Sequence, residues 1–178
     1  AGLKQNILRI QNELFNLGSQ LAVLPQDRRK NTPVIHKKNI QQLYKHQADA
    51  IQSIIQKKKN TIITTGVASG KSLCYQIPIL QGLLNNPQQR SLLLFPTKAL
   101  TQDQLSNLQS IQSKDENLKS SIYDGDTPQR NRPAIRKNAR ILLTNPDMLH
   151  TGILPHHTNW ADFFRNLKFV VIDELHTY

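Results

Sequence analysis

Two stretches of sequence decide the fold of this chain: TTGVASGKS at positions 64–72 and VVIDELH at positions 170–176. Each adjoins or contains an apolar, β-branched run, and each ends in polar residues that suit a polyphosphate and its metal ion. In this order they supply the groups needed to hold ATP with Mg²⁺ and to attack the γ-phosphate. The pair therefore predicts an ATPase site.

The first stretch has the pattern of a phosphate-binding loop. Residues 61–65 (TIITT) predict a short buried strand, and residues 71–84 predict a helix with Leu73, Ile77, Leu80 and Leu84 on one side. The turn between them would aim backbone N–H groups and the positive helix end at an anion. The residues predicted to bind the nucleotide phosphates are Thr65, Gly66, Val67, Ala68, Ser69, Gly70, Lys71 and Ser72.

Three residues of this loop have predicted individual roles. Gly70 lets the backbone approach the phosphates because it carries no Cβ. Lys71 would reach the β- and γ-phosphates, and the Ser72 hydroxyl would bind Mg²⁺. The match to G-x-x-x-x-G-K-[ST] is incomplete, because Thr65 occupies the first glycine position and Gly66 follows one residue late. The alternative is a Gly-Lys-Ser turn that caps an ordinary helix.

The second stretch places two acids at the end of an apolar run. Residues 169–172 (FVVI) predict a parallel strand covered on both faces, and Asp173 and Glu174 follow it. Ligands of open α/β sheets bind at that end of the strands. Asp173 would hold Mg²⁺, and Glu174 would act as the general base for the attacking water. The alternative is an acidic helix N-cap.

The remaining elements alternate between strand and helix. Helices are predicted near 46–58, 98–111, 128–137, 147 and 160–166, and strands at 91–95, 119–123, 140–144 and 168–172. Such alternation predicts an α/β fold with a mostly parallel sheet between two helical layers.

Composition limits the class of protein. The 178 residues carry a formal net charge of +11, which favours a polyanionic partner, and no run of about 18 apolar residues suggests a membrane span. Cys74 is the single cysteine, so no disulfide within the chain is possible. Cys74 is predicted to be a packed small side chain, and the sequence is consistent with a cytoplasmic location.

The first 40 residues form a separate predicted region. Leucine and isoleucine recur between Leu3 and Leu24 in a helical stripe that Gly18 and Ser19 would interrupt, and a basic linker follows. We therefore assign residues 1–40 to an accessory helix with a linker, and residues 41–178 to the ATP-binding domain.

Several motifs in this order resemble a known family. GVASGKS, FPTKAL, TNPDMLH and DELH are similar to motifs I, Ia, Ib and II of superfamily 2 helicases of the DExH kind. SGKSLCYQIPIL, YDGDTP, TNPDMLHTGILP and FFRNLKFVVIDELHTY resemble the RecQ-related branch that includes the mitomycin repair factor A type of DNA helicase. The resemblance covers roughly residues 43–178.

The resemblance implies further roles. Gln47 occupies the position of the glutamine that reads adenine, although a surface glutamine is the alternative. Thr97 and Lys98 in PTKAL, and Thr144 and Asn145 in TNPD, match positions that grip the phosphates of one nucleic-acid strand, although plain helix entry is the alternative. The DGDT turn at 124–127 is either a tight turn alone or a further strand contact.

The resemblance also implies binding partners and a longer polypeptide with a second domain. Its members are RecA-like ATPases that use ATP and Mg²⁺, bind nucleic acid, here DNA rather than RNA, and close on a second RecA-like domain of the same polypeptide. We expect a segment of such a protein, with a role in DNA repair, that ends before the strand of motif III. That strand would lie between the phosphate-loop strand and the motif II strand, so residues 1–178 alone are expected to be poorly stable and inactive.

Three other functions stay open at this point. The same ATPase core occurs in translocases or remodellers that move on duplex without separating it, and in RNA helicases. A nucleic-acid-binding module with a degenerate ATPase site is the remaining alternative, supported by Thr65.

Overall fold

The computed structural model describes residues 21–22, 43–66, 69–112 and 118–177. They form two compact units, the first ending at Pro78 and the second beginning at Ile79. The predicted accessory helix and linker lie outside the described residues except for Leu21–Ala22. That pair forms a short strand, so the placement of Leu21 in a helical stripe was wrong.

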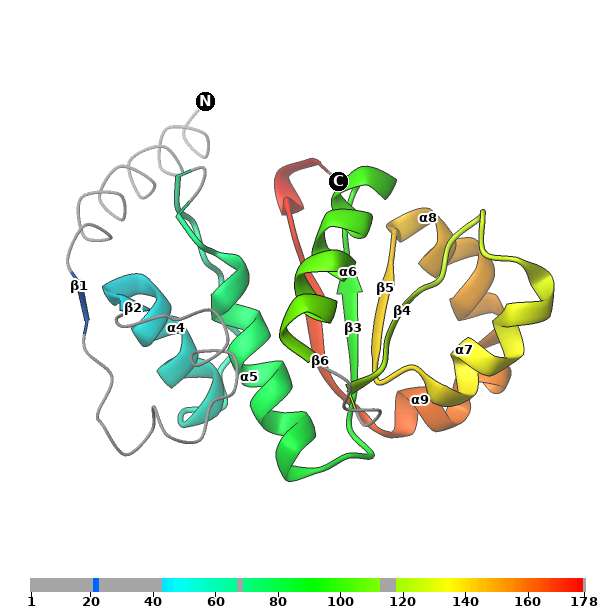
Figure 1. Cartoon of the computed structure of the whole chain (residues 1–178), viewed down its shortest axis with the longest axis horizontal. Helices are drawn as coiled ribbons and strands as arrows, with labels where there is room; N and C mark the ends of the chain where they lie inside the picture. Colours follow the sequence, from blue (N-terminus) through cyan, green and yellow to red (C-terminus); the bar gives the residue numbers. More distant parts are fainter. Residues whose placement is uncertain (1–20, 23–42, 67–68, 113–117, 178) are drawn as a thin grey trace. The chain divides into compact units, whose positions relative to one another are not determined.

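The described part of the first unit contains two short strands and a helix, followed by the start of a second helix (Figure 1). β1 (Leu21–Ala22) pairs antiparallel with β2 (Leu43–Tyr44), and α4 (Lys45–Ile55) follows directly. The helix buries Gln47, Ala50 and Ile51, which recur at helical spacing. The 14-residue helix α5 (Ser72–Asn85) begins in this unit and contains the unit boundary at Pro78.

The predicted strand at 61–65 was wrong. Residues 61–66 are described and have no strand or helix, and Ile62 is exposed. A strand is stabilised by hydrogen bonds to a neighbouring strand. Each pairing among the described strands involves other residues, so apolar, β-branched character alone did not make this segment a strand.

The second unit contains a four-strand parallel sheet in the order β4-β5-β3-β6. Ser91 of β3 is aligned with Ile141 of β5 and with Phe169 of β6, and Ser120 of β4 is aligned with Ile141. The strands are β3 (Arg90–Leu94), β4 (Ser120–Ile122), β5 (Ile141–Thr144) and β6 (Leu167–Ile172).

Helices cover the two faces of this sheet (Figure 1), as the predicted three-layer α/β arrangement requires. α6 (Lys98–Gln112) lies on one side, and the short helices α7 (Arg132–Asn138), α8 (Pro146–Met148) and α9 (Ala161–Arg165) lie on the other. The other helical segments among the described residues of the unit are three 3₁₀ segments and one π-helix: Gln129–Asn131, Leu149–Ile153 (π), Leu154–Trp160 and Leu175–Thr177. No helix of the described ranges is long and apolar enough to cross a membrane.

An aromatic cluster holds the helices α7 and α9 to the sheet. The Trp160 ring meets Tyr123 and Phe163 edge to face, with ring centroids 4.9 Å and 5.6 Å apart. Leu92 and Leu142, from the two central strands, belong to the same buried cluster. Burial of this kind contributes about 25 cal/mol per Å² of apolar surface, so the cluster is a main source of stability for the unit.

Strand β6 differs from the prediction for residues 169–172. Its residues alternate between half-buried and exposed, and Val170 and Ile172 are exposed. β6 is the last strand in the described sheet, next to β3 alone. The central strands β3 and β5 are buried along their whole length. These two strands are therefore covered on both faces, whereas β6, for which that cover was predicted, is not.

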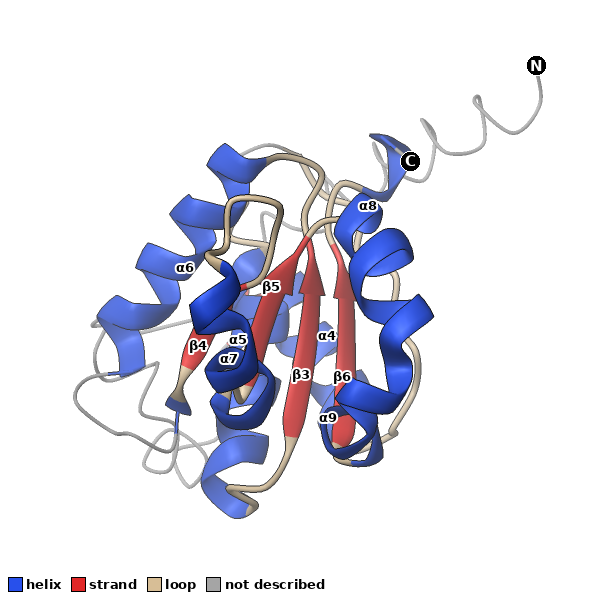
Figure 2. Cartoon of the chain, turned by 90° about the vertical axis from the view of Figure 1, so that its right-hand side faces the viewer, coloured by secondary structure: helices blue, strands red, loops and turns tan. Residues whose placement is uncertain are grey.

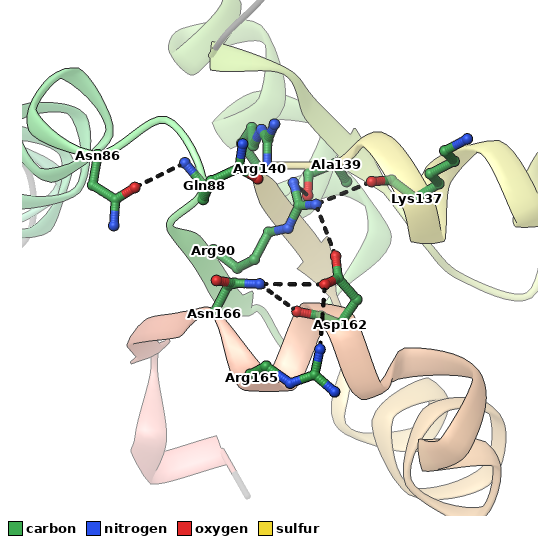
Figure 3. A network of polar contacts seen from close by, with 9 residues as sticks. All are labelled: Asn86, Gln88, Arg90, Lys137, Ala139, Arg140, Asp162, Arg165 and Asn166. Carbon is green, nitrogen blue, oxygen red and sulfur yellow. Dashed lines mark hydrogen bonds and ion pairs between the residues drawn. The ribbon is translucent and has the colours of Figure 1, made fainter.

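A buried arginine closes the amino-terminal edge of the sheet (Figure 3). Arg90, the first residue of β3, is 3% exposed, and its guanidinium donates to the carbonyls of Ala139 at 2.9 Å and Lys137 at 3.0 Å. It also forms an ion pair with Asp162 of α9, with 3.6 Å between Nη2 and Oδ2. Burial lowers the pKa of Arg90, and the charge of Arg140 acts in the same direction, whereas Asp162 opposes both. Arg90 thus ties β3 to the end of α7 and to α9.

Candidate functional site

The predicted motifs of the second unit meet at one edge of the sheet. All four strands are parallel, so their carboxyl ends lie together (Figure 2). Phe95 N donates to Thr144 O at 3.0 Å, and Asp173 N donates to Leu94 O at 3.0 Å. The segments that carry Lys98, Asn145 and Asp173 therefore leave the sheet side by side.

The acid pair follows β6 with an unusual backbone. Glu174 has a φ of +50°, a conformation that non-glycine residues rarely adopt and that costs on the order of 1 kcal/mol or more. Its N–H donates to its neighbour Asp173 Oδ1 at 3.0 Å, and its carboxylate lies 3.4 Å from His176 Nδ1. Such conformations are found at functional sites and in turns alike, and Lys58 has a φ of +51° as well. Catalysis by the acid pair therefore stays a prediction.

The PTKAL segment begins helix α6. Thr97 Oγ1 accepts a hydrogen bond from Leu100 N at 3.3 Å, which is the contact of an N-cap. Lys98 is the first helical residue, and its ammonium is paired with Asp126. The hydrogen bond that Lys98 donates to Asp126 raises the pKa of Lys98, and the charges of Asp126 and Asp124 add to that effect.

Thr144 and Asn145 each make a structural contact at the end of β5. Thr144 is buried, and its hydroxyl donates to Tyr123 O at 2.6 Å. Asn145 Oδ1 accepts from Met148 N at 2.8 Å and caps the short helix α8. The helix-entry alternative thus describes what Asn145 does in this structure, and strand contact by either residue stays a prediction.

The predicted phosphate loop lies in the first unit. Gly70 has a φ of +74°, and a Cβ placed there would come within 2.5 Å of Gln47 Nε2. Leu73 N donates to Gly70 O at 3.1 Å, so the first turn of α5 forms directly after the loop. Thr65, at the first glycine position, has its hydroxyl 2.5 Å from Ser69 Oγ across the loop. Val67 and Ala68 lie outside the described residues.

Gln47 joins the loop to helix α4. Its Nε2 donates to Gly70 O at 3.0 Å, and its Oε1 accepts from Tyr44 N at 3.0 Å. The residue is 2% exposed, so the surface-glutamine alternative was wrong. The amide keeps one N–H and one acceptor site beyond these two bonds, which is the pair that an adenine edge requires.

Cys74 is a packed side chain, as predicted. It is fully buried on α5, and burial raises the pKa of its thiol to about 12. The thiolate is the reactive form of cysteine, so this residue is chemically inert at neutral pH.

The predicted site residues are therefore divided between the two units. Gln47, Gly70, Lys71 and Ser72 belong to the first, with the other described residues of the loop. Thr97, Lys98, Thr144, Asn145, Asp173 and Glu174 belong to the second.

Near the site residues of the second unit, the contacts of two residues were not predicted from the sequence. Asp126 pairs with Lys98, and Arg132 donates to the backbone of the 124–127 turn. The motif YDGDTP marked the region, and basic residues recur after it between Arg130 and Arg140. Neither pattern specified which acid and which arginine would form these contacts.

The comparisons with known proteins agree over most of the chain. Residues 44–178 match the family model "DEAD/DEAH box helicase". The uncharacterised ATP-dependent helicase YprA of Bacillus subtilis is 50% identical over 145 residues, or 81% of this chain and 19% of that protein. The ATP-dependent helicase HRQ1 of Saccharomyces cerevisiae is 53% identical over 138 residues, or 76% of this chain and 13% of that protein.

Solved structures agree with the family match. The crystal structure of the DUF1998 helicase MrfA bound to DNA and AMPPNP aligns with a TM-score of 0.79 at 45% identity, over 89% of this chain and 22% of that one. The chain thus spans less than a quarter of the length of these three relatives. Its α/β architecture is that of a RecA-like helicase domain. The fold and the match over residues 44–178 together show that this chain belongs to the DEAD/DEAH box helicase family, with MrfA, YprA and HRQ1 among its close relatives.

Proposed function

We propose that this chain is the ATP-binding part of a superfamily 2 DNA helicase that couples hydrolysis of Mg-ATP to movement along one strand and to unwinding. The observation that carries the proposal is the edge of the sheet where motifs Ia, Ib and II leave β3, β5 and β6 together. DNA is favoured over RNA because MrfA, which the chain resembles at 45% identity, was crystallised with DNA. A second RecA-like domain of the same polypeptide is the proposed partner, and a role in DNA repair and a cytoplasmic location belong to the same proposal.

The phosphate loop suits a nucleotide on two counts. Gly70 has the positive φ and the close neighbour that exclude a side chain, and α5 begins directly after the loop. The N-terminus of a 14-residue helix favours an anion through the helix dipole. In this proposal the loop from Thr65 to Ser72 binds the phosphates, with Lys71 on the β- and γ-phosphates.

The acids complete the proposed chemistry. Bound ATP would supply a phosphoanhydride whose hydrolysis drives the cycle, and Mg²⁺ would neutralise charge on its phosphates. Ser72 and Asp173 offer the oxygen ligands that Mg²⁺ prefers. Glu174 accepts the proton of the attacking water on its carboxylate, as a general base must.

Gln47 is proposed to read the adenine base while it holds the loop. Its remaining N–H and acceptor site can pair with the base, and its bond to Gly70 O links that contact to the phosphates. Because the side chain is 2% exposed, base binding requires a local rearrangement that opens access to its amide.

Replacing Gly70 with alanine is expected to weaken nucleotide binding at least about tenfold, because a backbone φ of +74° is strained for alanine and its Cβ would meet Gln47 Nε2 at 2.5 Å. Affinity for a fluorescent ATP analogue in the full-length protein provides the measurement. Gly125→Ala is the matched control, since a Cβ at Gly125 would meet no described atom within 4 Å. Equal affinity of both variants would contradict the proposed loop.

A strand-displacement assay tests the proposed function itself. We expect the full-length protein to unwind a 3′-tailed DNA duplex in the presence of Mg-ATP, and to leave a blunt DNA duplex and a tailed RNA duplex intact. DNA-stimulated ATP hydrolysis without unwinding would favour a duplex translocase. Preference for the RNA duplex would favour an RNA helicase, and the absence of hydrolysis would favour a binding module with a degenerate site.

A further inference from the structure

The ammonium of Lys98 is held by a carboxylate of another segment. Lys98 Nζ lies 2.5 Å from Asp126 Oδ2, and 28 positions separate the two residues in the sequence. Lys98 is the first residue of the 15-residue helix α6, where backbone N–H groups and the helix dipole also favour an anion. The carboxylate of Asp126 thus pairs with the lysine that the resemblance to superfamily 2 helicases predicts to bind a strand phosphate.

The turn that carries Asp126 is held by its own hydrogen bonds. The buried carboxylate of Asp124 accepts from Asp126 N at 3.1 Å and from Thr127 Oγ1 at 3.0 Å. Thr127 Oγ1 in turn accepts from Asp124 N at 2.9 Å. These bonds fix the backbone at Asp126 without using its side chain, so its carboxylate is directed outward from a rigid turn.

Arg132 attaches this turn to the body of the second unit. Its guanidinium donates to Thr127 O at 3.1 Å and to Asp124 O at 3.3 Å, and it lies over the Tyr123 ring at 5.2 Å from the centroid. Tyr123 itself belongs to the aromatic cluster with Trp160. Because the turn is anchored and a lysine stem is flexible, Lys98 is the partner that moves when the pair opens.

We infer that Asp126 takes the place of a nucleic-acid phosphate on Lys98 in the free protein, and that strand binding must displace its carboxylate. The inference rests on the proposed function, because it assumes that Lys98 binds a strand phosphate. The pair is suited to exchange, since the side chains of Lys98 and Asp126 are 58% and 73% exposed and exposed ion pairs are weak. Asp126 therefore reduces strand affinity and eases release of the strand.

Binding of a single-stranded DNA oligonucleotide to the full-length protein tests this inference. We expect Asp126→Asn to tighten binding about threefold at low salt, because strand binding no longer has to break an exposed ion pair, and such pairs have small free energies. Asparagine at this position keeps the hydrogen bond that the backbone N–H of residue 126 donates to the carboxylate of Asp124. Asp103→Asn is the matched control, since it removes one exposed carboxylate from α6 and leaves the turn unchanged.

A double-mutant cycle separates competition at Lys98 from a general effect of charge. In the Lys98→Gln background, Asp126→Asn is expected to leave the affinity unchanged. Equal tightening in both backgrounds, or tightening by Asp103→Asn to the same extent, would overturn the inference. If the unaltered protein binds the strand and Asp126→Asn has no effect, only this inference fails. If the unaltered protein binds no strand, the proposed function fails together with it.

Discussion

Replacing Lys71 with alanine is expected to lower ATP hydrolysis by the full-length protein at least about 100-fold, because one preorganised charge aimed at the transferred phosphoryl group supplies a factor of this size. Lys71 stands between Gly70, whose φ is +74°, and Ser72, the first residue of α5. Its backbone carbonyl accepts from Cys74 N at 2.9 Å, so the start of the helix fixes the position of the residue. Phosphate release in the presence of DNA gives the rate.

Lys168→Ala is the control for this experiment. It removes the same charge from an exposed position on β6, so the rate should stay within about twofold of the unaltered protein, as for most surface substitutions. Unchanged hydrolysis by the Lys71 variant would show that this loop does not serve as the phosphate site. It would then favour the binding module with a degenerate ATPase site.

Replacing Arg90 with alanine is expected to lower the free energy of unfolding of the second unit by about 3 kcal/mol, because two carbonyls would lose a charged donor inside the protein. Those carbonyls belong to Lys137 and Ala139, at the end of α7. Denaturation of the chain can be followed through Trp160, the single tryptophan, which lies in the aromatic cluster of the same unit.

Arg165 offers a matched control, because it faces the same acid from an exposed position. Its guanidinium is 3.9 Å from Asp162, and both side chains are more than two thirds exposed. Arg165→Ala is expected to change stability by less than about 0.5 kcal/mol. Equal destabilisation by the two substitutions would show that the ion pair with Asp162, and not the buried carbonyl contacts, is the important interaction of Arg90.

Much of the fold follows from local patterns. Apolar runs and helical spacing predicted β3 to β6, α4, α5 and α6 to within a few residues, because each pattern reports which side of a segment is buried. The same reasoning failed for residues 61–65 and for the outer face of β6. Whether such a segment becomes a paired strand, or is covered on both faces, depends on neighbours that are distant in the sequence.

In the candidate site, too, the sequence predicted which residues matter, but the structure was needed to show what they contact. The sequence identified Gln47 through its resemblance to a family, whereas its bond to Gly70 O, 23 positions away, became visible only in the structure. Lys98 was predicted to bind phosphate, but its pairing with Asp126 was not. Arg132, one of many basic residues in its segment, braces the 124–127 turn through backbone carbonyls that no sequence pattern marks.

By itself, then, the sequence determined the order of β3 to β6 and of the helices between them, the position of motifs Ia, Ib and II at the ends of strands, and membership of a helicase family. These are properties of short segments, whose composition and spacing restrict the backbone locally. The tertiary structure alone decided which edge strand stays exposed, which arginine is buried, and which carboxylate holds Lys98. Those outcomes depend on distances between residues far apart in the chain, and such distances exist only once the chain has folded.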